Sequence, residues 1–207
     1  AASGAVLRGV GTILQVVAGQ PAGVYGDGPT SKAGFDGIQA LALGSDGSIY
    51  VAETNSVRRI LKGQVTTFAG KYKEKGHVDG PVGSSRFAGI REVALDVDGS
   101  LLVGDVYYVR RISGGKVTTI AGNGKRPKEY PLHSDGAALV SFLSGPSSLL
   151  VGSDGILLDD SGALLRRLSQ GKVSTLMGTE EAKSPFARDG SSNVARFFWI
   201  KSLTRFK

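Results

Sequence analysis

A repeat of about 52 residues limits what this chain can fold into more than any other feature of its sequence. Residues 65–70 read Val-Thr-Thr-Phe-Ala-Gly, and close variants return at 117–122 and 173–178, with an earlier relative at 14–19. The glycines that close these segments, at 19, 70, 122 and 178, are 51, 52 and 56 residues apart. A long, regular period of this kind indicates that the chain is built from similar supersecondary units.

Four further columns of residues keep the same phase as this segment. They are the arginine pairs at 58–59 and 110–111 with a third pair at 166–167, the Asp-Gly pairs at 46–47, 98–99 and 154–155, a second set of Asp-Gly pairs at 27–28, 79–80, 135–136 and 189–190, and the phenylalanines Phe35, Phe87, Phe142 and Phe197. Five columns that stay in register over three or four copies exclude chance similarity. The phenylalanines are predicted to fill the space between the units.

The residues within one period predict four short strands. Segments 39–44, 48–53, 57–61 and 65–69 are apolar or β-branched and about five residues long, as strands usually are. The Asp-Gly pair at 46–47 suits a tight hairpin turn, because glycine adopts a positive φ at little cost. No segment has a sustained helical period. Four strands per repeat predict an all-β fold, a β-propeller with one four-stranded blade in each repeat.

The repeats predict a single propeller domain over residues 1–207, with incomplete blades at both ends. The complete blades are expected at 38–70, 90–122 and 146–178, the last two strands of a preceding blade at 5–18, and the start of a further blade at 199–207. Two arrangements fit, a piece of a larger propeller or a four-bladed ring closed by the first strands. Because such a ring would lack one strand, the larger propeller is favoured. An open arc would expose strand edges that need cover, so we expect a larger assembly.

The blade pattern resembles that of NHL-repeat propellers. It combines the Asp-Gly turn, Val-Arg-Arg-Ile at 57–60 and 109–112, and the closing Val-Thr-Thr-(Phe/Ile)-Ala-Gly strand. The variety with long Gly-Asp-Gly-Pro loops, as at 26–29, is the most similar, and the third repeat departs most, at 158–162 and Met177. The resemblance implies a propeller, usually of six blades. The family includes RNA-binding modules, protein-interaction modules, extracellular adhesion domains and a lyase, so the fold alone does not give the function.

The composition favours an acidic partner and excludes several kinds of site. Lysine and arginine total 25 against 18 acidic residues, which gives a net charge of +7 and a pI near 9.7. There is no cysteine, which excludes a disulfide framework and thiolate chemistry. No apolar stretch approaches the roughly 20 residues of a membrane-spanning helix. The absence of cysteine and of glycosylation sequons favours an intracellular or organellar protein.

The paired arginines have a structural and a functional interpretation. Adjacent residues on a strand point to opposite faces, so one arginine of each pair is expected to face inward. An acid precedes each pair, and the predicted sets are Glu53 with Arg58 and Arg59, Asp105 with Arg110 and Arg111, and Asp159 or Asp160 with Arg166 and Arg167. Since the acids recur with the arginines, repeated structural ion pairs are favoured over a stripe that binds phosphates.

Two basic loops are the candidate binding surface. They follow the closing strand in two successive repeats and contain Lys71, Tyr72, Lys73 and Lys75 in one, and Lys125, Arg126, Lys128 and Tyr130 in the other. Equivalent places in adjacent repeats predict one shared face. Lysine with interleaved tyrosine can bind a phosphate backbone and stack a base. The same surface can dock an acidic protein.

Metal and catalytic sites are not expected. His77 and His133 each stand two residues before an Asp-Gly pair, but no third ligand repeats with them. Asp96 and Asp98 are similar to part of a calcium loop, yet Ala94 stands where such a loop begins with an acid, so a hairpin turn is favoured. The sequence contains no Gly-x-Ser-x-Gly elbow, no phosphate-binding Gly-x4-Gly-Lys motif and no dinucleotide fingerprint.

The sequence therefore predicts a non-catalytic interaction scaffold, a subunit of a larger assembly that presents its basic loops to an acidic protein. RNA binding through the same loops is the alternative. A second alternative is a propeller hydrolase or lyase whose catalytic residues lie in other blades. No cofactor and no small-molecule substrate are expected.

Overall fold

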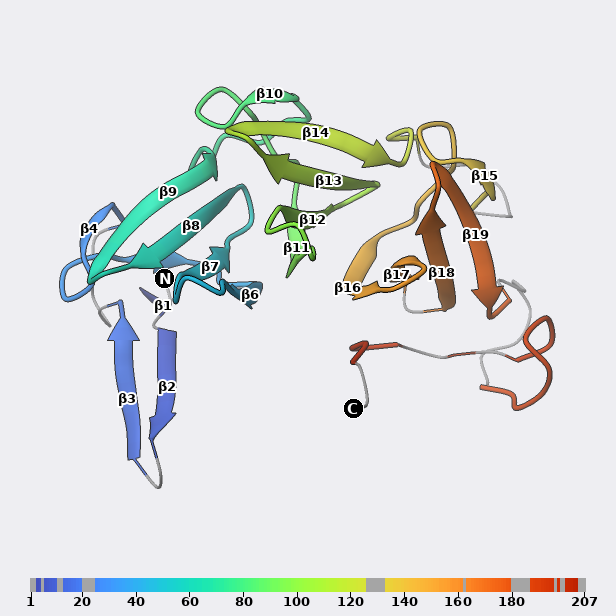
Figure 1. Cartoon of the computed structure of the whole chain (residues 1–207), viewed down its shortest axis with the longest axis horizontal. Helices are drawn as coiled ribbons and strands as arrows, with labels where there is room; N and C mark the ends of the chain where they lie inside the picture. Colours follow the sequence, from blue (N-terminus) through green and yellow to red (C-terminus); the bar gives the residue numbers. More distant parts are fainter. Residues whose placement is uncertain are drawn as a thin grey trace. The chain divides into compact units, whose positions relative to one another are not determined.

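The computed structural model describes residues 3–4, 6–10, 13–19, 25–125, 133–161, 163–179, 187–195, 197 and 200–204, with side chains from Val16 onward. Every regular element in these ranges is a β-strand (Figure 1). Contacts divide the chain into two compact units, Ala1–Ile90 and Arg91–Lys207. No helix that could cross a membrane occurs in the described ranges.

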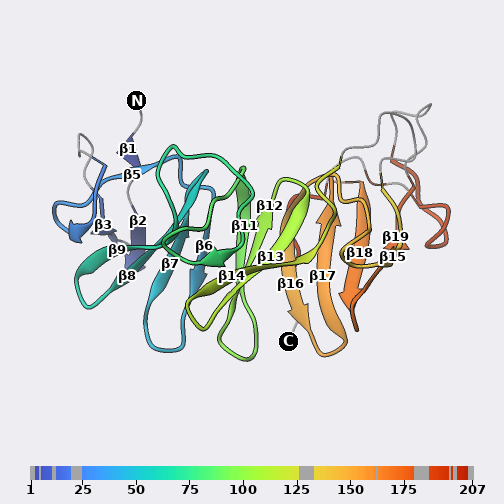
Figure 2. The same ribbon diagram turned by 90° about the horizontal axis from the view of Figure 1, so that it is seen from above.

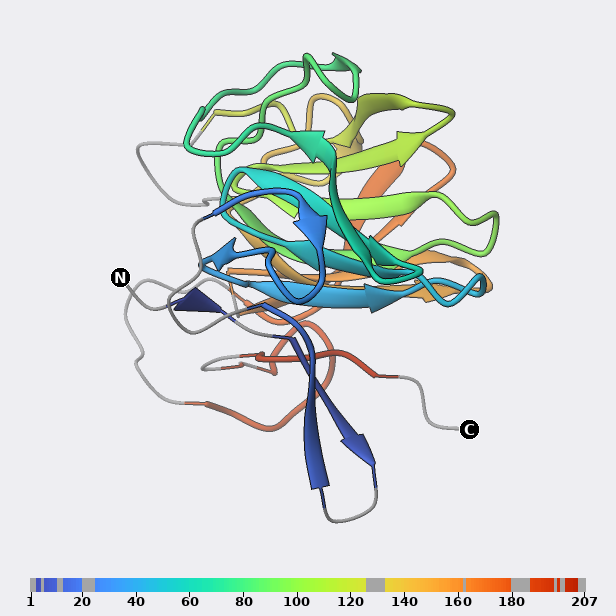
Figure 3. The same ribbon diagram turned by 90° about the vertical axis from the view of Figure 1, so that its left-hand side faces the viewer.

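The first unit contains one antiparallel sheet of five strands and a separate hairpin. The sheet has the order β4-β9-β8-β7-β6, and its strands are β4 (Gly28–Pro29), β6 (Ala40–Leu43), β7 (Ile49–Ala52), β8 (Ser56–Leu61) and β9 (Gln64–Gly70). The hairpin consists of β2 (Val6–Val10) and β3 (Ile13–Ala18), and Figure 3 shows it as a long two-stranded ribbon. The short strands β1 (Ser3–Gly4) and β5 (Phe35–Asp36) pair with each other, and β10 (Gly80–Pro81) follows the sheet in the chain.

The second unit repeats this plan. β11 (Ile90–Leu95) starts at the boundary and continues with β12 (Leu101–Asp105), β13 (Tyr108–Ser113) and β14 (Lys116–Ala121), each paired with the next. A five-stranded sheet follows in the order β15-β19-β18-β17-β16, and its strands are β15 (Gly136–Ala137), β16 (Pro146–Gly152), β17 (Gly155–Asp160), β18 (Leu164–Ser169) and β19 (Lys172–Met177). Figure 2 shows β16 to β19 side by side.

The Asp-Gly pairs form the hairpin turns that the sequence predicts. In the turn between β6 and β7, the Asp46 carboxylate accepts hydrogen bonds from the backbone N–H and the hydroxyl of Ser48, at 2.9 and 2.5 Å. Gly47 has φ +81°, a conformation that side chains disfavour. Asp98 accepts the same two bonds from Ser100 between β11 and β12. The local sequence thus fixes where each strand ends.

Alternation along the strands builds an apolar core in each unit. In the first unit, buried residues from the sheet, the hairpin and the loop before β6 form a cluster of Ala18, Ala33, Phe35, Val51, Ile60 and Val65. In the second unit the buried cluster consists of Leu102, Val109, Ala121, Ala138, Leu143, Leu149, Ile156, Leu158, Leu168 and Val173. Removing these aliphatic side chains from water is the main stabilisation of each unit.

The all-β fold is confirmed, and the segments predicted as four strands coincide with β6 to β9. The structure differs from the prediction in two respects. Phe35 and Phe87 are buried, whereas Phe142 and Phe197 are only half-buried. In the third repeat, Leu143, which stands eight residues after the aspartate of its Asp-Gly pair, is the residue buried in the core. The described part of the expected last blade, residues 200–204, forms no strand.

Candidate interaction site

The first arginine of the first pair is buried and anchors the Asp-Gly loop. Arg58 lies on β8 with no exposed side-chain surface, and its Nη2 is 2.7 Å from Oδ1 of Asp27. The same nitrogen donates to the carbonyl oxygen of Gly26 at 2.7 Å, and Nη1 is 3.6 Å from Oε2 of Glu53. A buried charge needs this number of partners, because each unmet hydrogen bond would be costly away from water.

The other repeats hold their first arginine in the same way. Arg110 lies 3.3 Å from Asp105, and both side chains are buried. Arg166 lies 2.7 Å from Asp160 and 3.0 Å from Asp135. Of the two alternatives left open for the third repeat, Asp160 is therefore the partner of Arg166. Asp159 accepts hydrogen bonds from the backbone N–H and hydroxyl of Ser147 instead.

The second arginine of each pair lies on the other face and reaches the hairpin turn. Arg59 is 2.6 Å from Asp46, Arg111 contacts Asp96 and lies 3.5 Å from Asp98, and Arg167 is 3.4 Å from Asp154. These side chains are partly exposed, so each pair contributes little to stability. The carboxylates of the turns neutralise the stripe of positive charge that phosphate binding would need.

The basic loop after β9 is held by its tyrosine. Tyr72 stacks on Tyr25 with 3.6 Å between ring centroids and an angle of 11°. Its hydroxyl donates to Oδ2 of Asp36 at 2.9 Å. Nζ of Lys73 lies 4.9 Å from the centre of the Tyr72 ring. Lys73 also has a left-handed backbone, with φ +58°, which turns the chain sharply at this point. The contacts of Tyr72 therefore give the loop a defined conformation, unlike a solvated loop tip that makes no contacts with the rest of the protein.

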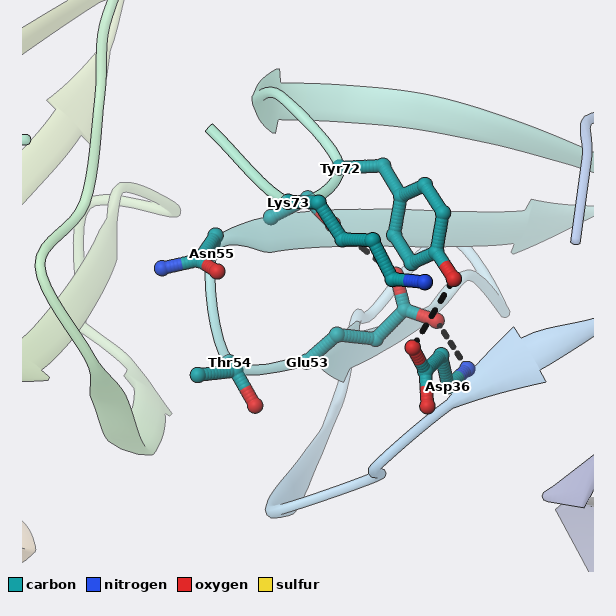
Figure 4. A pocket seen from close by; sticks show the side chains of 7 residues that line it. Asp36, Glu53, Thr54, Asn55, Tyr72 and Lys73 are labelled. Atoms are coloured by element: carbon teal, nitrogen blue, oxygen red, sulfur yellow. Dashed lines mark hydrogen bonds between the residues drawn. The ribbon is translucent and has the colours of Figure 1, made fainter. Parts of the chain in front are cut away.

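A pocket of about 180 Å³ lies beside this loop (Figure 4). Its lining comes from the end of β5, the β7–β8 turn and the loop, and consists of Asp36, Glu53, Thr54, Asn55, Ser56, Tyr72 and Lys73. This volume is smaller than that of most drug-sized ligand sites. The pocket can accept one side chain or a small polar group.

The acid at the base of this pocket is fully engaged by the protein. Glu53 accepts hydrogen bonds from the Asp36 backbone N–H at 2.8 Å, from the Ser56 hydroxyl at 2.8 Å and from the Tyr25 hydroxyl at 3.2 Å. Burial raises the pKa of Glu53, although these bonds and Arg58 act in the opposite direction. Both carboxylate oxygens of Glu53 therefore accept hydrogen bonds from groups within the protein.

The pocket rim carries a positive charge. The side chain of Lys73 is exposed, and its hydrogen bond with the Tyr72 hydroxyl raises the pKa of Lys73. Lys73 is therefore fully charged at neutral pH. Lys75 is exposed as well, whereas Lys71 forms an ion pair with Glu74, which also lies 2.7 Å from Arg86. The loop carries more positive than negative charge.

The second predicted basic loop is described only at its first residue. Lys125 is exposed, and its backbone N–H donates to the side chain of Asn123 at 2.9 Å. Arg126, Lys128 and Tyr130 lie outside the described residues. The shared basic face therefore stays a prediction.

The histidines and the turn acids do not gather into a metal centre within the described ranges. No group of three His, Asp or Glu side chains there could hold an ion. His77 is exposed and His133 is half-buried, and both have partners within the protein. Asp96 forms an ion pair with Arg111, and Asp98 lies 3.5 Å from the same guanidinium.

Sequence reasoning missed two members of the site, Tyr25 and Asp36. Tyr25 stands two residues before the Asp27-Gly28 pair, the same column that His77 and His133 occupy. In the structure its ring lies over the guanidinium of Arg58, 4.7 Å from the ring centre. The shared column is the signal that could have identified this position. Nothing in the sequence around Asp36 indicates its bond to Tyr72.

Comparison with known proteins supports the fold. No model of a known protein family matches the chain. Teneurin-3 of Mus musculus is 31% identical over 185 residues, which cover 79% of this chain and 7% of the teneurin. The chain thus corresponds to a small part of that relative.

Two solved structures from Bacteroides thetaiotaomicron are similar in fold. An auxiliary nutrient binding protein has a TM-score of 0.64 and 14% identity, with 92% of this chain and 44% of that chain covered. A structural genomics protein of unknown function has a TM-score of 0.61 and 20% identity, with 80% and 41% covered. These likenesses show that the chain has an all-β, propeller-like fold.

Proposed function

We propose that this chain is a non-catalytic interaction scaffold of the NHL-repeat type, whose sheets are the blades of a propeller within a larger assembly. The similarity to part of teneurin-3 and the five repeated columns of residues support this assignment. In this proposal a rigid array of blades fixes the positions of the loops, and the loops bind the partner.

We infer that the partner is an acidic protein segment and that it binds at the loop of residues 71–75. The observation that carries this inference is the anchoring of Tyr72 on Tyr25 and Asp36, in a loop where Lys73 and Lys75 are exposed. Lys73 also contacts the Tyr72 ring, and a cation that its neighbours already hold loses less conformational entropy when it binds a carboxylate. The pocket beside Lys73 adds room for one side chain of the partner.

The same geometry disfavours RNA at this loop. A base would need a free face of the Tyr72 ring. One face stacks on Tyr25, and Nζ of Lys73 lies 4.9 Å from the ring centre. The lysines could contact phosphates. Stacking on aromatic rings gives single-stranded RNA much of its affinity, but Tyr72 already stacks on Tyr25 within the protein.

A binding experiment tests the proposal. Labelled oligoglutamate is titrated with the protein and with the variant Lys73→Glu/Lys75→Glu, and the matched control is Lys32→Glu/Lys62→Glu, which changes two exposed lysines elsewhere in the same unit. We expect the loop variant to bind about tenfold more weakly, by about 1.4 kcal/mol, and the control to bind as the parent does.

Two results would overturn the proposal. Equal losses in both variants would mean that only the net charge attracts the acidic peptide. Displacement of oligoglutamate by a single-stranded RNA at much lower concentration, with a steep salt dependence, would favour the RNA alternative.

A further inference from the structure

One apolar sheet face in the first unit extends beyond the residues that cover it. Val51, Ile60 and Val65 are buried against Val17 and Ala18 of β3. On the same face, the register places Leu41 opposite Val51 and Leu43 opposite Ile49. Leu41 is 48% exposed and Leu43 is 73% exposed. The aliphatic surface therefore continues onto β6, where it is exposed to solvent instead of being covered by another strand.

The corresponding residues of the second unit are covered. Counted back from Asp46 and Asp154 in the two hairpin turns, Leu41 and Leu43 correspond to Leu149 and Val151. Leu149 is only 6% exposed, and Val151 is partly buried.

The cover comes from the inner strands of the preceding sheet. Leu149 and Val151 belong to one cluster with Leu102 of β12 and Ala94 of β11. β12 also contacts β16 directly. Two inner strands of one sheet thus cover the inner strand of the next.

The hairpin β2–β3 provides only the outer half of such a cover. Ala18-Gly19 aligns with Ala121-Gly122, so β3 corresponds to β14 and β2 corresponds to β13. β13 lies between β12 and β14 in its sheet, whereas β2 pairs with β3 alone among the described strands. The open edge of β2 is the side on which a strand equivalent to β12 would pair. An open edge and an exposed apolar face thus adjoin the same vacant position.

We propose that this position binds a β-hairpin supplied from outside residues 1–207, with its two strands in the places that β11 and β12 hold in the second unit. One strand of the hairpin pairs with β2 through main-chain hydrogen bonds, as in β-strand addition. Alternate side chains of both strands cover Leu41 and Leu43, with a small residue where Ala94 stands and a large aliphatic one where Leu102 stands. No residue that lines the pocket beside the loop of residues 71–75 lies on β6.

A peptide with the sequence of residues 90–105, which form β11 and β12, is the probe. It is labelled and titrated with the intact chain, and the peptide carrying Leu102→Asp serves as its control. We expect saturable binding of the first peptide and at least tenfold weaker binding of the second, because the exchange removes one aliphatic contact and buries a charge. Amide exchange in Val6–Val10 should slow when the peptide binds.

Two protein variants locate the binding surface. Leu41→Gln/Leu43→Gln should weaken binding about tenfold without loss of fold, since both side chains are largely exposed in the free protein. Val97→Gln is the matched control, because Val97 is 91% exposed in a hairpin turn of the second unit. It should bind the peptide as the parent does.

Three results would overturn the proposal. The first is the absence of saturable binding. The second is binding that Leu41→Gln/Leu43→Gln leaves unchanged, which would mean that the peptide replaces its own counterpart in the second unit. The third is self-association that the double variant abolishes, seen by light scattering, because a second copy of this chain would then be the occupant.

Discussion

The carboxylate of Asp135 lies 3.0 Å from the guanidinium of Arg166, although 31 residues separate the two in the sequence. The same carboxylate accepts hydrogen bonds from the backbone N–H and the hydroxyl of Thr175, at 2.8 and 2.9 Å. Burial alone would raise the pKa of Asp135, but these bonds and Arg166 outweigh it and lower the pKa. One aspartate thus connects a loop to β18 and β19, and Asp27 makes the equivalent contacts with Arg58 and Thr67.

Removing the guanidinium from this arrangement should destabilise the fold strongly. Arg166→Met leaves the buried carboxylate of Asp160 without its cation, and we expect a loss of about 3–5 kcal/mol in the free energy of unfolding. Arg167→Met, whose partner Asp154 is exposed, should cost less than about 1 kcal/mol. Urea denaturation measures both. Similar losses in the two variants would contradict a special role for the buried pair.

A double variant separates the ion pair from the packing around it. Arg166→Met/Asp160→Asn removes both charges and keeps an Oδ1 atom that can accept hydrogen bonds from the backbone N–H groups of Ser144 and Gly145. We expect this variant to recover most of the stability that Arg166→Met loses. If it is as unstable as the single variant, the packing of the arginine side chain, and not the charge, is what stabilises the sheet.

Glu92 should make the stability of the second unit depend on pH. Burial raises the pKa of Glu92 to about 7, and the nearby charge of Asp159 adds to this, while a hydrogen bond from the Val93 N–H acts against it. The folded protein then holds a proton that the unfolded chain releases near the ordinary glutamate pKa of 4.5. Stability contributed by this proton is complete below pH 4.5 and is lost as the pH rises through about 7.

The variant Glu92→Gln isolates this effect. Its amide resembles the protonated acid and does not titrate, so the difference in stability between variant and parent should grow in favour of the variant between pH 4.5 and 7. Urea denaturation across this range measures the difference. A constant difference would show that Glu92 titrates alike in the folded and unfolded states.

Two glycines in the second unit test the packing of the turns. Gly122 and Gly99 both have left-handed backbones, with φ +94° and +80°, so alanine costs about 1 kcal/mol at either position. A Cβ at Gly122 would also strike the carbonyl group of Tyr107, whereas Gly99 faces open space. We expect Gly122→Ala to lose about 3 kcal/mol or more, and Gly99→Ala only the backbone cost. Thermal and urea unfolding of the two variants distinguish these values.

Tyr72 should control the conformation of the basic loop without contributing charge. Tyr72→Phe keeps the stack on Tyr25 but removes the hydrogen bond to Asp36, a loss of about 1 kcal/mol. Tyr72→Ala removes both contacts. Amide exchange in residues 71–75 should quicken from the parent to Phe to Ala, and binding of oligoglutamate should weaken in the same order. Unchanged binding would mean that the lysines act through charge alone.

The strands and their turns were accessible to sequence reasoning because they follow local rules. Alternating apolar residues and Asp-Gly turns give β6 to β9 nearly their observed limits. The strands β4 and β15 were missed because Gly28–Pro29 and Gly136–Ala137 have no strand propensity of their own. Each becomes a strand only through pairing with a distant partner, β9 or β19.

The candidate site was predictable in composition but not in geometry. Lysine content identified the loop of residues 71–75, yet the stack of Tyr72 on Tyr25 depends on the fold that brings distant loops together. The partner of Arg166 was ambiguous for a specific reason. Glu53 and Asp105 each stand seven residues after their turn aspartate, whereas Asp160 stands six residues after Asp154. The repeat phase therefore could not decide between Asp159 and Asp160.

The pairing of β4 with β9 and of β15 with β19 sets rules for cutting this protein into pieces. The sequence repeat suggests boundaries at residues 38 and 146, which lie just before the innermost strand β6 and at the start of the innermost strand β16. A cut there would strip the outermost strand from the sheet and leave Arg58 or Arg166 without Asp27 or Asp135. A truncated or exchanged module should therefore begin before Tyr25 or His133. The outermost strand of each sheet comes from the loop that precedes its innermost strand, and a later start would remove it.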